Sequence, residues 1–483
     1  MTIPQTSPIS SIARMPARPR TTRAGRVLIV SNRLPLTATI DGDGVDLRRS
    51  SGGLATGLRG VHERANSLWI GWTGLPDGQA PEVRSTLGMK MRDAGAIAVS
   101  LDEDEIDGFY RRYANGVLWP LLHDLPMRSE FGHWTTYRRV NERYADTAAR
   151  HARPGDRLWV HDYQLMLVPQ LLRERRPDVR IGFFLHSPFP KPETFTSLPH
   201  AAALLEGLLG ADIVGFHTRE YARHFLAAVR TLLPYSVSAD QITVGERQVS
   251  ALAWPMGIDV ASFEAYAEAP AVVSEAKRIR GDGFLFLGVD RLDYTKGIPQ
   301  RLVAFERLLD TRPELHGQVR LLQLAVPSRE DVSGYREIRE EVEGLVARIN
   351  ARFSRPDWTP VEYQHRSVDV ETLVTLYRAA DVMLVTSLRD GMNLVAKEFV
   401  AARVDCDGIL ILSEHAGAAS ELRTALLVDP HDVDALAGTY EAALAMSPTE
   451  RWVRMRRLRR AVRMNDVHRW AAFFIEALRA PRD

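Results

Sequence analysis

The sequence contains almost no cysteine, and its charges nearly cancel. Only Cys406 among the 483 residues is a cysteine, so no disulfide can form within the chain and no cysteine-rich metal site exists. This composition suits a reducing compartment, and we expect a cytoplasmic protein. Lys and Arg number 62 against 61 Asp and Glu, a formal net charge of +1. We therefore expect neither nucleic acid nor an anionic membrane as a partner.

Long apolar runs are also missing. No stretch approaches the roughly 18 apolar residues that a membrane-spanning helix needs. Residues 1–25 lack the apolar centre of a secretory signal and contain Ser, Thr, Pro and Arg without any acid. A transit peptide shares these features, but the composition favours a disordered N-terminal extension.

The common nucleotide-binding fingerprints are absent. There is no G-x-x-x-x-G-K-[ST] loop, and the run Gly52–Gly57 does not match G-x-G-x-x-G. D-x-D triplets, which could hold a divalent metal, occur at 41–43, 102–104 and 405–407. The first is typical of a hairpin turn and the others lie in polar connections. We expect no metal ion and no other cofactor.

The sequence does contain a regular alternation of strand-like and helix-like segments. With 483 residues, the chain is too long to fold around a single core. The strands expected in a first series are Arg26–Ser31, Ser67–Trp72, Ala96–Leu101, Arg157–His161, Arg180–His186, Ile213–His217 and Ser250–Trp254. Those of a second series are Phe284–Val289, Val319–Ala325, Val382–Thr386 and Gly408–Leu412. This rhythm predicts an α/β fold with two doubly wound parallel sheets.

The domain boundary is expected near 255–259, where a strand-like run ends in Pro and Gly. We expect an N-terminal domain at 26–256, a C-terminal domain at 257–462, and a helix within 463–483 that packs back on the N-terminal domain. The side chains expected on one side of this helix are Trp470, Phe473, Phe474 and Leu478.

Polar side chains follow many of the expected strands directly. They are Arg33, Asp162, Tyr163, His186, Arg291, Lys296 and Arg329. Each has a plain explanation when taken alone, such as a solvated loop or a structural histidine. Strand ends in this architecture converge on one crevice, however, and two cations in one loop, Arg291 and Lys296, suit a diphosphate. We therefore interpret them as parts of a ligand site.

The segment LRDGMNLVAKE at 388–398 joins an expected strand to an expected helix. It could be an ordinary turn in which Asp390 or Asn393 caps the helix and Gly391 relaxes the backbone. It could also bind a ligand, because free amides at the start of a helix attract anions and hydroxyl oxygens.

Nine segments together resemble the trehalose-6-phosphate synthases, from about residue 26 to the C-terminus. They are RVLIVSNRLP, SSGGLATG, FYRRYANGVLWP, WVHDYQL, GFFLHSPFP, GFHT, VDRLDYTKG, SLRDGMNLVAKEFVAA and SEHAGAASEL. The resemblance implies a GT-B fold, with two Rossmann-like domains facing a cleft. It implies transfer of glucose from a nucleotide sugar to glucose 6-phosphate with retention, which gives α,α-trehalose 6-phosphate. UDP-glucose is the favoured donor, although the sequence leaves uracil, adenine and guanine open.

The resemblance also assigns roles to matched residues. The residues implied to bind the acceptor are Arg33, Gly53, Tyr110, Trp119, Asp162, Tyr163 and Arg329. Those implied to bind the donor are Gly53, His186, Arg291, Lys296, Asp390, Gly391, Met392, Asn393, Leu394 and Glu398. Those implied to take part in catalysis are Asp162, His186, Arg291, Lys296 and Asp390. A homo-oligomer, either a dimer or a tetramer, is expected.

Two alternatives remain open from the sequence. Arg33 and Arg329 recognise only a phosphate, so a related enzyme could use glycerol 3-phosphate as the acceptor. The other alternative is a non-catalytic sensor of sugar phosphates. The intact residues Arg291, Lys296, Asp390 and Glu398 argue against it.

Overall fold

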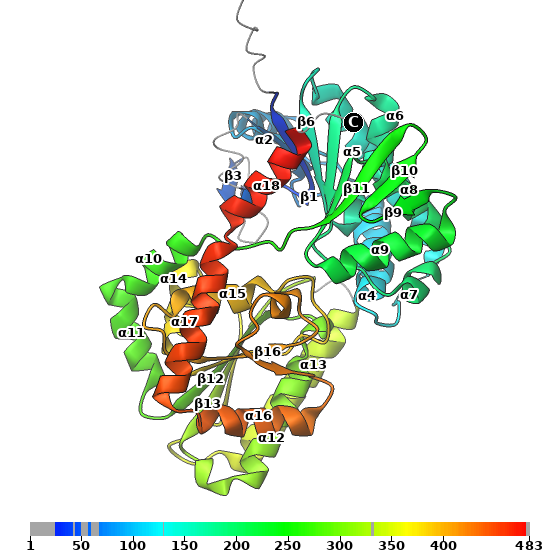
Figure 1. Cartoon of the computed structure of the whole chain (residues 1–483). Coiled ribbons are helices and arrows are strands. Elements are labelled where there is room, and N and C mark those ends of the chain that lie inside the picture. Colours follow the sequence, from blue (N-terminus) through cyan, green and yellow to red (C-terminus); the bar gives the residue numbers. More distant parts are fainter. Residues whose placement is uncertain are drawn as a thin grey trace, which may run out of the picture.

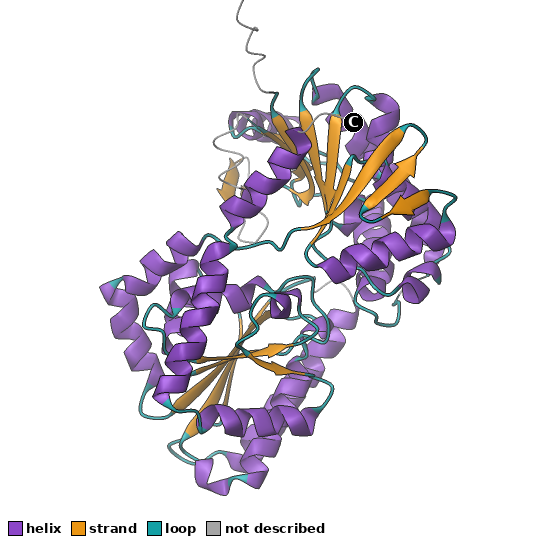
Figure 2. Cartoon of the chain, viewed as in Figure 1, coloured by secondary structure: helices purple, strands orange, loops and turns teal. Residues whose placement is uncertain are grey.

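The chain forms two α/β bodies, each built around one central sheet (Figures 1 and 2). The computed structural model describes residues 25–479 apart from 42–43, 50–56, 59–66, 129 and 330–332. The predicted disorder of residues 1–25 therefore falls almost wholly outside the described residues. None of the helices among the described residues is both long and apolar enough to cross a membrane.

The first sheet has nine strands in the order β5-β4-β1-β6-β7-β8-β11-β10-β9. Their bounds are β1 Val27–Arg33, β4 Leu68–Trp72, β5 Ala96–Ala98, β6 Arg157–His161, β7 Arg180–Phe184, β8 Ile213–Phe216, β9 Ser236–Ser238, β10 Gln241–Val244 and β11 Arg247–Ala253. Neighbours from β5 to β11 are parallel, whereas β9, β10 and β11 pair antiparallel. This antiparallel edge was not predicted. It needs only a tight turn at Gly245, where φ is 60°, instead of a crossover helix.

The second sheet has six strands in the order β14-β13-β12-β15-β16-β17, and all its neighbours are parallel. The bounds are β12 Phe284–Arg291, β13 Val319–Val326, β14 Val361–His365, β15 Val382–Val385, β16 Ile409–Ser413 and β17 Leu426–Val428. β12 is buried along most of its length, as a strand covered on both faces must be. β2 (Leu36–Asp41) and β3 (Gly44–Arg49) form a separate hairpin, which agrees with the turn expected at 41–43.

Helices connect these strands and cover the sheets (Figure 2). Those of the first body are α2 Pro81–Asp93, α3 Glu103–Glu105, the π-helix η1 Ile106–Leu118, α4 Trp119–Leu122, η2 Phe131–His133, α5 Trp134–His151, η3 Tyr163–Leu165, α6 Val168–Arg175, α7 Pro192–Thr196, α8 Ala201–Leu209 and α9 Arg219–Leu232. Those that follow are α10 Val260–Glu268, α11 Pro270–Arg280, η4 Tyr294–Lys296, α12 Ile298–Thr311, η5 Pro313–Leu315, α13 Ser333–Phe353, α14 Val370–Ala379, α15 Leu394–Ala402, η6 Gly417–Ser420, α16 Val433–Leu444, α17 Pro448–Met464 and α18 Val467–Arg479.

Each sheet changes its direction of winding once. In the first sheet the chain passes from β1 outward to β4 and β5, then returns to β6 on the other side of β1. In the second it passes from β12 to β13 and β14, then returns to β15. Connections leave such a pair of strands in opposite directions, which opens a crevice at their carboxyl ends. The strand ends of β1, β6, β12 and β15 are therefore where a ligand site is expected.

The last helix, α18, returns to the first body and packs on its sheet (Figure 1). The Phe474 ring stacks on Trp159 of β6 with centroids 4.3 Å apart. The centroid of the Trp470 ring lies 5.0 Å from that of Trp159. Gly182 in β7 makes room, because a Cβ there would stand 2.5 Å from the Phe474 ring. The prediction that Phe473 shares this face was wrong: Phe473 is 47% exposed, since it lies off the stripe that residues four apart form.

This packing predicts unequal effects for two neighbouring phenylalanines. Phe474→Ala should lower the free energy of unfolding by about 3–5 kcal/mol, because it removes a fully buried ring. Phe473→Ala, the matched control, should change it by less than about 0.5 kcal/mol. Denaturant unfolding of both variants measures this. Equal losses would show that α18 does not pack in this orientation.

Candidate active site

The carboxyl ends of the two sheets meet at a cleft of about 530 Å³. The predicted residues that line it are Arg33, Tyr110, Trp119, Asp162, Tyr163, His186, Arg291, Arg329 and Asp390. Lys296 lies beside it, bonded to Asp390. Glu398 lies outside this lining, on α15, and Gly53 falls outside the described residues.

Tyr110 and Trp119 reach the same cleft because they lie on and directly after a π-helix, η1. Nine residues of α-helix make two and a half turns and would leave the two rings on opposite sides. A π-helix has about 4.4 residues per turn, so nine residues make nearly two full turns. The local i→i+5 winding, visible in the bond from the Trp119 N–H to the Ala114 carbonyl, thus brings both aromatic rings to one side.

Arg33 and Arg329 approach Tyr110 from different domains. The Arg33 guanidinium lies 4.1 Å from the Trp72 ring centroid and 5.7 Å from that of Tyr110. Burial by itself would raise the pKa of the Tyr110 hydroxyl, but Arg329 and Arg33 together hold it below its usual value. Arg33 of β1 and Arg329 of the loop after β13 therefore produce a strongly positive field beside Tyr110. Such a field favours binding of an anion there.

Arg329 is held in a network that sequence reasoning did not identify. Its backbone is left-handed, with φ 50°, and its guanidinium donates to the Tyr335 hydroxyl and, at 3.1 Å, to the Tyr163 hydroxyl. Asp293 forms an ion pair with it at 3.5 Å. Burial would raise the pKa of Asp293, yet Arg329, Arg291 and Lys296 lower it to about 2. The sequence carried a signal for this role of Asp293, because in DRLDYTK it lies between two cations, Arg291 and Lys296.

Lys296 and Asp390 form a buried ion pair. The Lys296 Nζ donates to the Asp390 Oδ2 at 2.6 Å, and Ser387 Oγ and Asn393 Nδ2 donate to the same oxygen at 3.1 and 3.0 Å. Burial acts to raise the pKa of Asp390, but Lys296, His123 and Asn393 bring it below the usual value. Asp390 is thus a fixed carboxylate whose other oxygen can accept from a ligand hydroxyl.

The turn at 388–398 caps a helix, as one interpretation of its sequence predicts, and its role in binding a ligand stays a prediction. Asn393 caps α15: its side chain accepts from the Ala396 N–H at 3.2 Å, and its φ is 68°. Gly391 serves close packing between the domains, because a Cβ there would stand 2.0 Å from the His186 carbonyl oxygen. The helix cap and the Asp390 carboxylate are therefore parts of one structure at the edge of the cleft.

Asp162 and His186 follow β6 and β7. The Asp162 carboxylate accepts from the His186 N–H at 3.1 Å, and burial raises its pKa. His186 Nε2 lies 3.1 Å from His161 Nδ1, and burial lowers the pKa of His186 to about 3. His186 is therefore a neutral hydrogen-bonding group near pH 7, not a cation or a general acid.

Glu398 stands one turn into α15 and accepts from the Tyr377 hydroxyl at 2.9 Å. Burial raises its pKa to about 7, and the Tyr377 bond opposes this shift. Lys397 beside it is a structural residue: its Nζ donates to the Met256 carbonyl at 2.8 Å and forms an ion pair with Glu421.

Three acids of the described D-x-D triplets have partners within the protein. Asp102 caps α3 by accepting from the Glu105 N–H at 2.8 Å. Asp405 forms an ion pair with Arg378 at 2.7 Å, and Asp407 accepts from the Gly408 N–H at 2.8 Å. Residues 42–43 fall outside the described residues, and the expected absence of a metal at these triplets stays a prediction.

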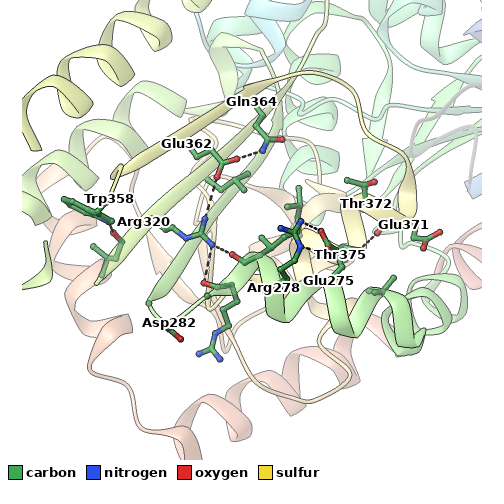
Figure 3. A pocket seen from close by; sticks show the side chains of 18 of the residues that line it. Glu275, Arg278, Asp282, Arg320, Trp358, Glu362, Gln364, Glu371, Thr372 and Thr375 are labelled. Carbon is green, nitrogen blue, oxygen red and sulfur yellow. Dashed lines mark hydrogen bonds and ion pairs between the residues drawn. The ribbon is translucent and has the colours of Figure 1, made fainter. Parts of the chain in front are cut away.

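A second hollow, of about 1020 Å³, opens at the amino ends of β12 and β13 (Figure 3). It lies at the opposite end of the second sheet from the cleft. Its charged side chains pair with one another, as Arg278 does with Glu275 at 2.5 Å and Arg320 with Glu362 at 3.6 Å. They converge on no common point, so this hollow has the character of a solvated surface groove.

Comparison with known proteins agrees with this geometry. Residues 25–480 match the family described as glycosyltransferase family 20. The trehalose-6-phosphate synthase of Mycolicibacterium gilvum is 44% identical over 467 residues, which cover 93% of each chain. A bifunctional trehalose-6-phosphate synthase/phosphatase of Thermoproteus tenax is 42% identical, over 94% of this chain but only 63% of the relative.

A solved structure described as trehalose-6-phosphate from E. coli bound with UDP-2-fluoro glucose superposes with a TM-score of 0.84. It is 34% identical, and the match covers 95% of this chain and 100% of that one. The two sheets and the cleft between them have the GT-B arrangement. The chain belongs to glycosyltransferase family 20.

Proposed function

We propose that the protein transfers glucose from UDP-glucose to glucose 6-phosphate with retention, giving α,α-trehalose 6-phosphate and UDP. The observation that carries this proposal is the division of cations in the cleft. Arg33 and Arg329 surround Tyr110, whereas Lys296 is bonded to Asp390 at the ends of the second sheet. Arg291 lies between these two groups in the lining of the cleft, with its guanidinium 5.8 Å from the Trp119 ring. Family membership and relatives named as UDP-forming synthases support the same reaction.

The acceptor occupies the side of the first domain. Arg33 and Arg329 bind its phosphate, and Tyr110, Trp119, Asp162 and Tyr163 contact its sugar. The Trp119 ring supports this assignment, since it lies 4.3 Å from the Arg329 guanidinium and offers an apolar face beside the phosphate position. Gly53, which the resemblance assigns to the close approach of the backbone, stays a prediction.

The donor lies along the second domain. Arg291 and Lys296 bind the diphosphate. Asp390 and the amides of Gly391, Met392, Asn393 and Leu394 hold the transferred glucose, which His186 also contacts. Glu398 accepts from the ribose hydroxyls. The position of Asn393 as the cap of α15 supports the role of the amides, because the first N–H groups of a helix have no partner within it.

In the proposed reaction the acceptor hydroxyl enters on the face from which the diphosphate leaves. The bond between the anomeric carbon and the phosphate oxygen breaks, a new carbon–oxygen bond forms, and the acceptor proton passes to the leaving phosphate oxygen. Arg291 and Lys296 stabilise the charge that grows on the diphosphate. Lys296, Ser387 and Asn393 all donate to one oxygen of Asp390, and we assign the other oxygen to a sugar hydroxyl and not to nucleophilic attack. The residues thus position the reactants and stabilise charge.

We also propose a cytoplasmic location and a homo-oligomeric state. Cys406 is the only cysteine in the sequence, and its free thiol suits a reducing compartment. Sedimentation analysis would distinguish a dimer or tetramer from a monomer.

The proposed function is tested by release of nucleoside diphosphate from UDP-, ADP- and GDP-glucose, each with glucose 6-phosphate or glycerol 3-phosphate. The protein is first treated with a chelator. We expect UDP-glucose and glucose 6-phosphate to react best and chelation to leave the rate unchanged, with the product an α,α-linked disaccharide phosphate by NMR. Preferred use of glycerol 3-phosphate would favour the related enzyme, and no turnover with any pair would favour the sensor.

Removing one acceptor arginine should separate acceptor use from donor binding. Arg33→Ala should lower kcat/KM for glucose 6-phosphate about 30- to 1,000-fold, because a charge-assisted contact to a dianion is lost. The Kd for UDP-glucose, measured by calorimetry, should hardly change. Arg48→Ala is the matched control, because Arg48 is an exposed arginine of β3 paired with Asp46. A comparable loss of donor affinity in Arg33→Ala would assign Arg33 to the nucleotide.

Donor affinity should depend on the ionisation of Glu398. The ionised carboxylate accepts from both ribose hydroxyls, and its pKa in the free protein is about 7. The Kd for UDP-glucose should therefore rise about tenfold from pH 8 to pH 6, as the carboxylate is protonated. Tyr377→Phe removes the hydrogen bond that lowers this pKa and should move the midpoint to higher pH. A pH-dependent Kd that persists in Glu398→Gln would contradict the assignment.

A further inference from the structure

Two histidines and an aspartate gather at the carboxyl end of the second sheet, outside the proposed catalytic residues. His415 follows β16, and Asp429 and His431 follow β17. One ligand atom from each lies within 4.8 Å of the other two. β16 and β17 are neighbours in the sheet, so the parallel pairing of their ends brings the three side chains together.

The loops around these side chains are held by hydrogen bonds. The Asp429 Oδ1 accepts from the His431 N–H at 2.9 Å and lies 3.3 Å from His415 Nε2. The His415 N–H donates to Ser413 Oγ at 3.1 Å. Both N–H groups belong to the backbone, so these bonds hold the Asp429 carboxylate and the two loops in place. The three side chains are half-buried or exposed, so small rotations can bring them to the spacing of about 3.3 Å that tetrahedral ligands at 2.0–2.1 Å require.

We propose that His415, Asp429 and His431 form a binding site for a divalent transition-metal ion, of which zinc and cobalt are the best matched. Two imidazole nitrogens and one carboxylate oxygen suit such ions, whereas magnesium and calcium prefer oxygen ligands alone. Three protein ligands leave a fourth position for water. This site is separate from the proposed transfer chemistry, in which Arg291 and Lys296 supply the positive charge.

The site lies against the segment 388–398, which contains Asp390 and is called the donor loop below. The His415 carbonyl accepts from the Asp390 N–H at 3.2 Å, and the Gly417 N–H donates to the Asp390 carbonyl at 3.2 Å. His415 and His431 also line a hollow of about 1090 Å³, together with Tyr221 and Arg389, which gives an ion a route from solvent. An ion that joins the loops after β16 and β17 would therefore brace the segment on which Asp390 rests.

Cobalt provides a direct test in the untagged full chain after chelator treatment. We expect Co²⁺ to bind at one equivalent per chain, with visible absorption typical of a nitrogen- and oxygen-ligated ion. Zn²⁺ should displace it and Mg²⁺ should not. Bound Zn²⁺ should also raise Tm in proportion to ln(1 + [Zn²⁺]/Kd).

Three variants and one control locate the site. His415→Ala, His431→Ala and Asp429→Asn should each weaken Co²⁺ binding about tenfold or more. His468→Ala is the control and should leave the affinity for Co²⁺ unchanged. His468 also pairs with an acid, Asp259 at 3.8 Å, but it belongs to no group of three possible ligands among the described residues. Unchanged affinity in His415→Ala or His431→Ala, equal loss in His468→Ala, or no cobalt absorption in the parent would overturn the proposal.

Discussion

The ion pair between Lys296 and Asp390 is the contact on which the arrangement of the cleft depends. Lys296 comes from the loop after β12 and Asp390 from the loop after β15, the two strands at which the second sheet changes direction. Both groups are buried, so losing one partner would leave an uncompensated charge, at a cost of about 3–5 kcal/mol. Ser387 and Asn393 bond to the same carboxylate oxygen, which joins the cap of α15 to this pair. The donor loop is therefore placed by electrostatics within the second domain.

The same loop forms much of the contact between the domains. The Tyr221 hydroxyl donates to the Asp390 carbonyl at 2.9 Å, and Arg389 forms an ion pair with Asp124 of the first domain. Gly391 lies so close to the His186 carbonyl that no side chain fits between them. A displacement between the domains must therefore act on the residues that we propose bind the donor glucose.

The two arginines that we propose bind the acceptor, Arg33 and Arg329, are held by side chains of the protein itself. Asp293 lies beneath Arg329, and the Tyr163 and Tyr335 hydroxyls accept from the same guanidinium. Arg33 instead lies over Trp72. Arg329 is thus fixed before any ligand arrives, while Arg33 remains exposed, so a phosphate would meet one preorganised cation and one that can adjust.

The sequence by itself determined the α/β class, the central strands and the residues at their carboxyl ends, because buried parallel strands are short apolar runs and the polar residue after each run is local information. It could not determine which strand ends meet, since that depends on the strand order 5-4-1-6 in one sheet and 13-12-15-16 in the other. It also missed the antiparallel edge at β9 to β11 and the exposure of Phe473. Tyr110 and Trp119 share a side only through the π-helical winding of η1, which the nine-residue spacing does not reveal. The shift in the pKa of Glu398 likewise arises from burial, and those of Asp293 and Tyr110 arise from burial together with cations such as Arg329 that are distant in sequence. Only the tertiary structure brings these groups together.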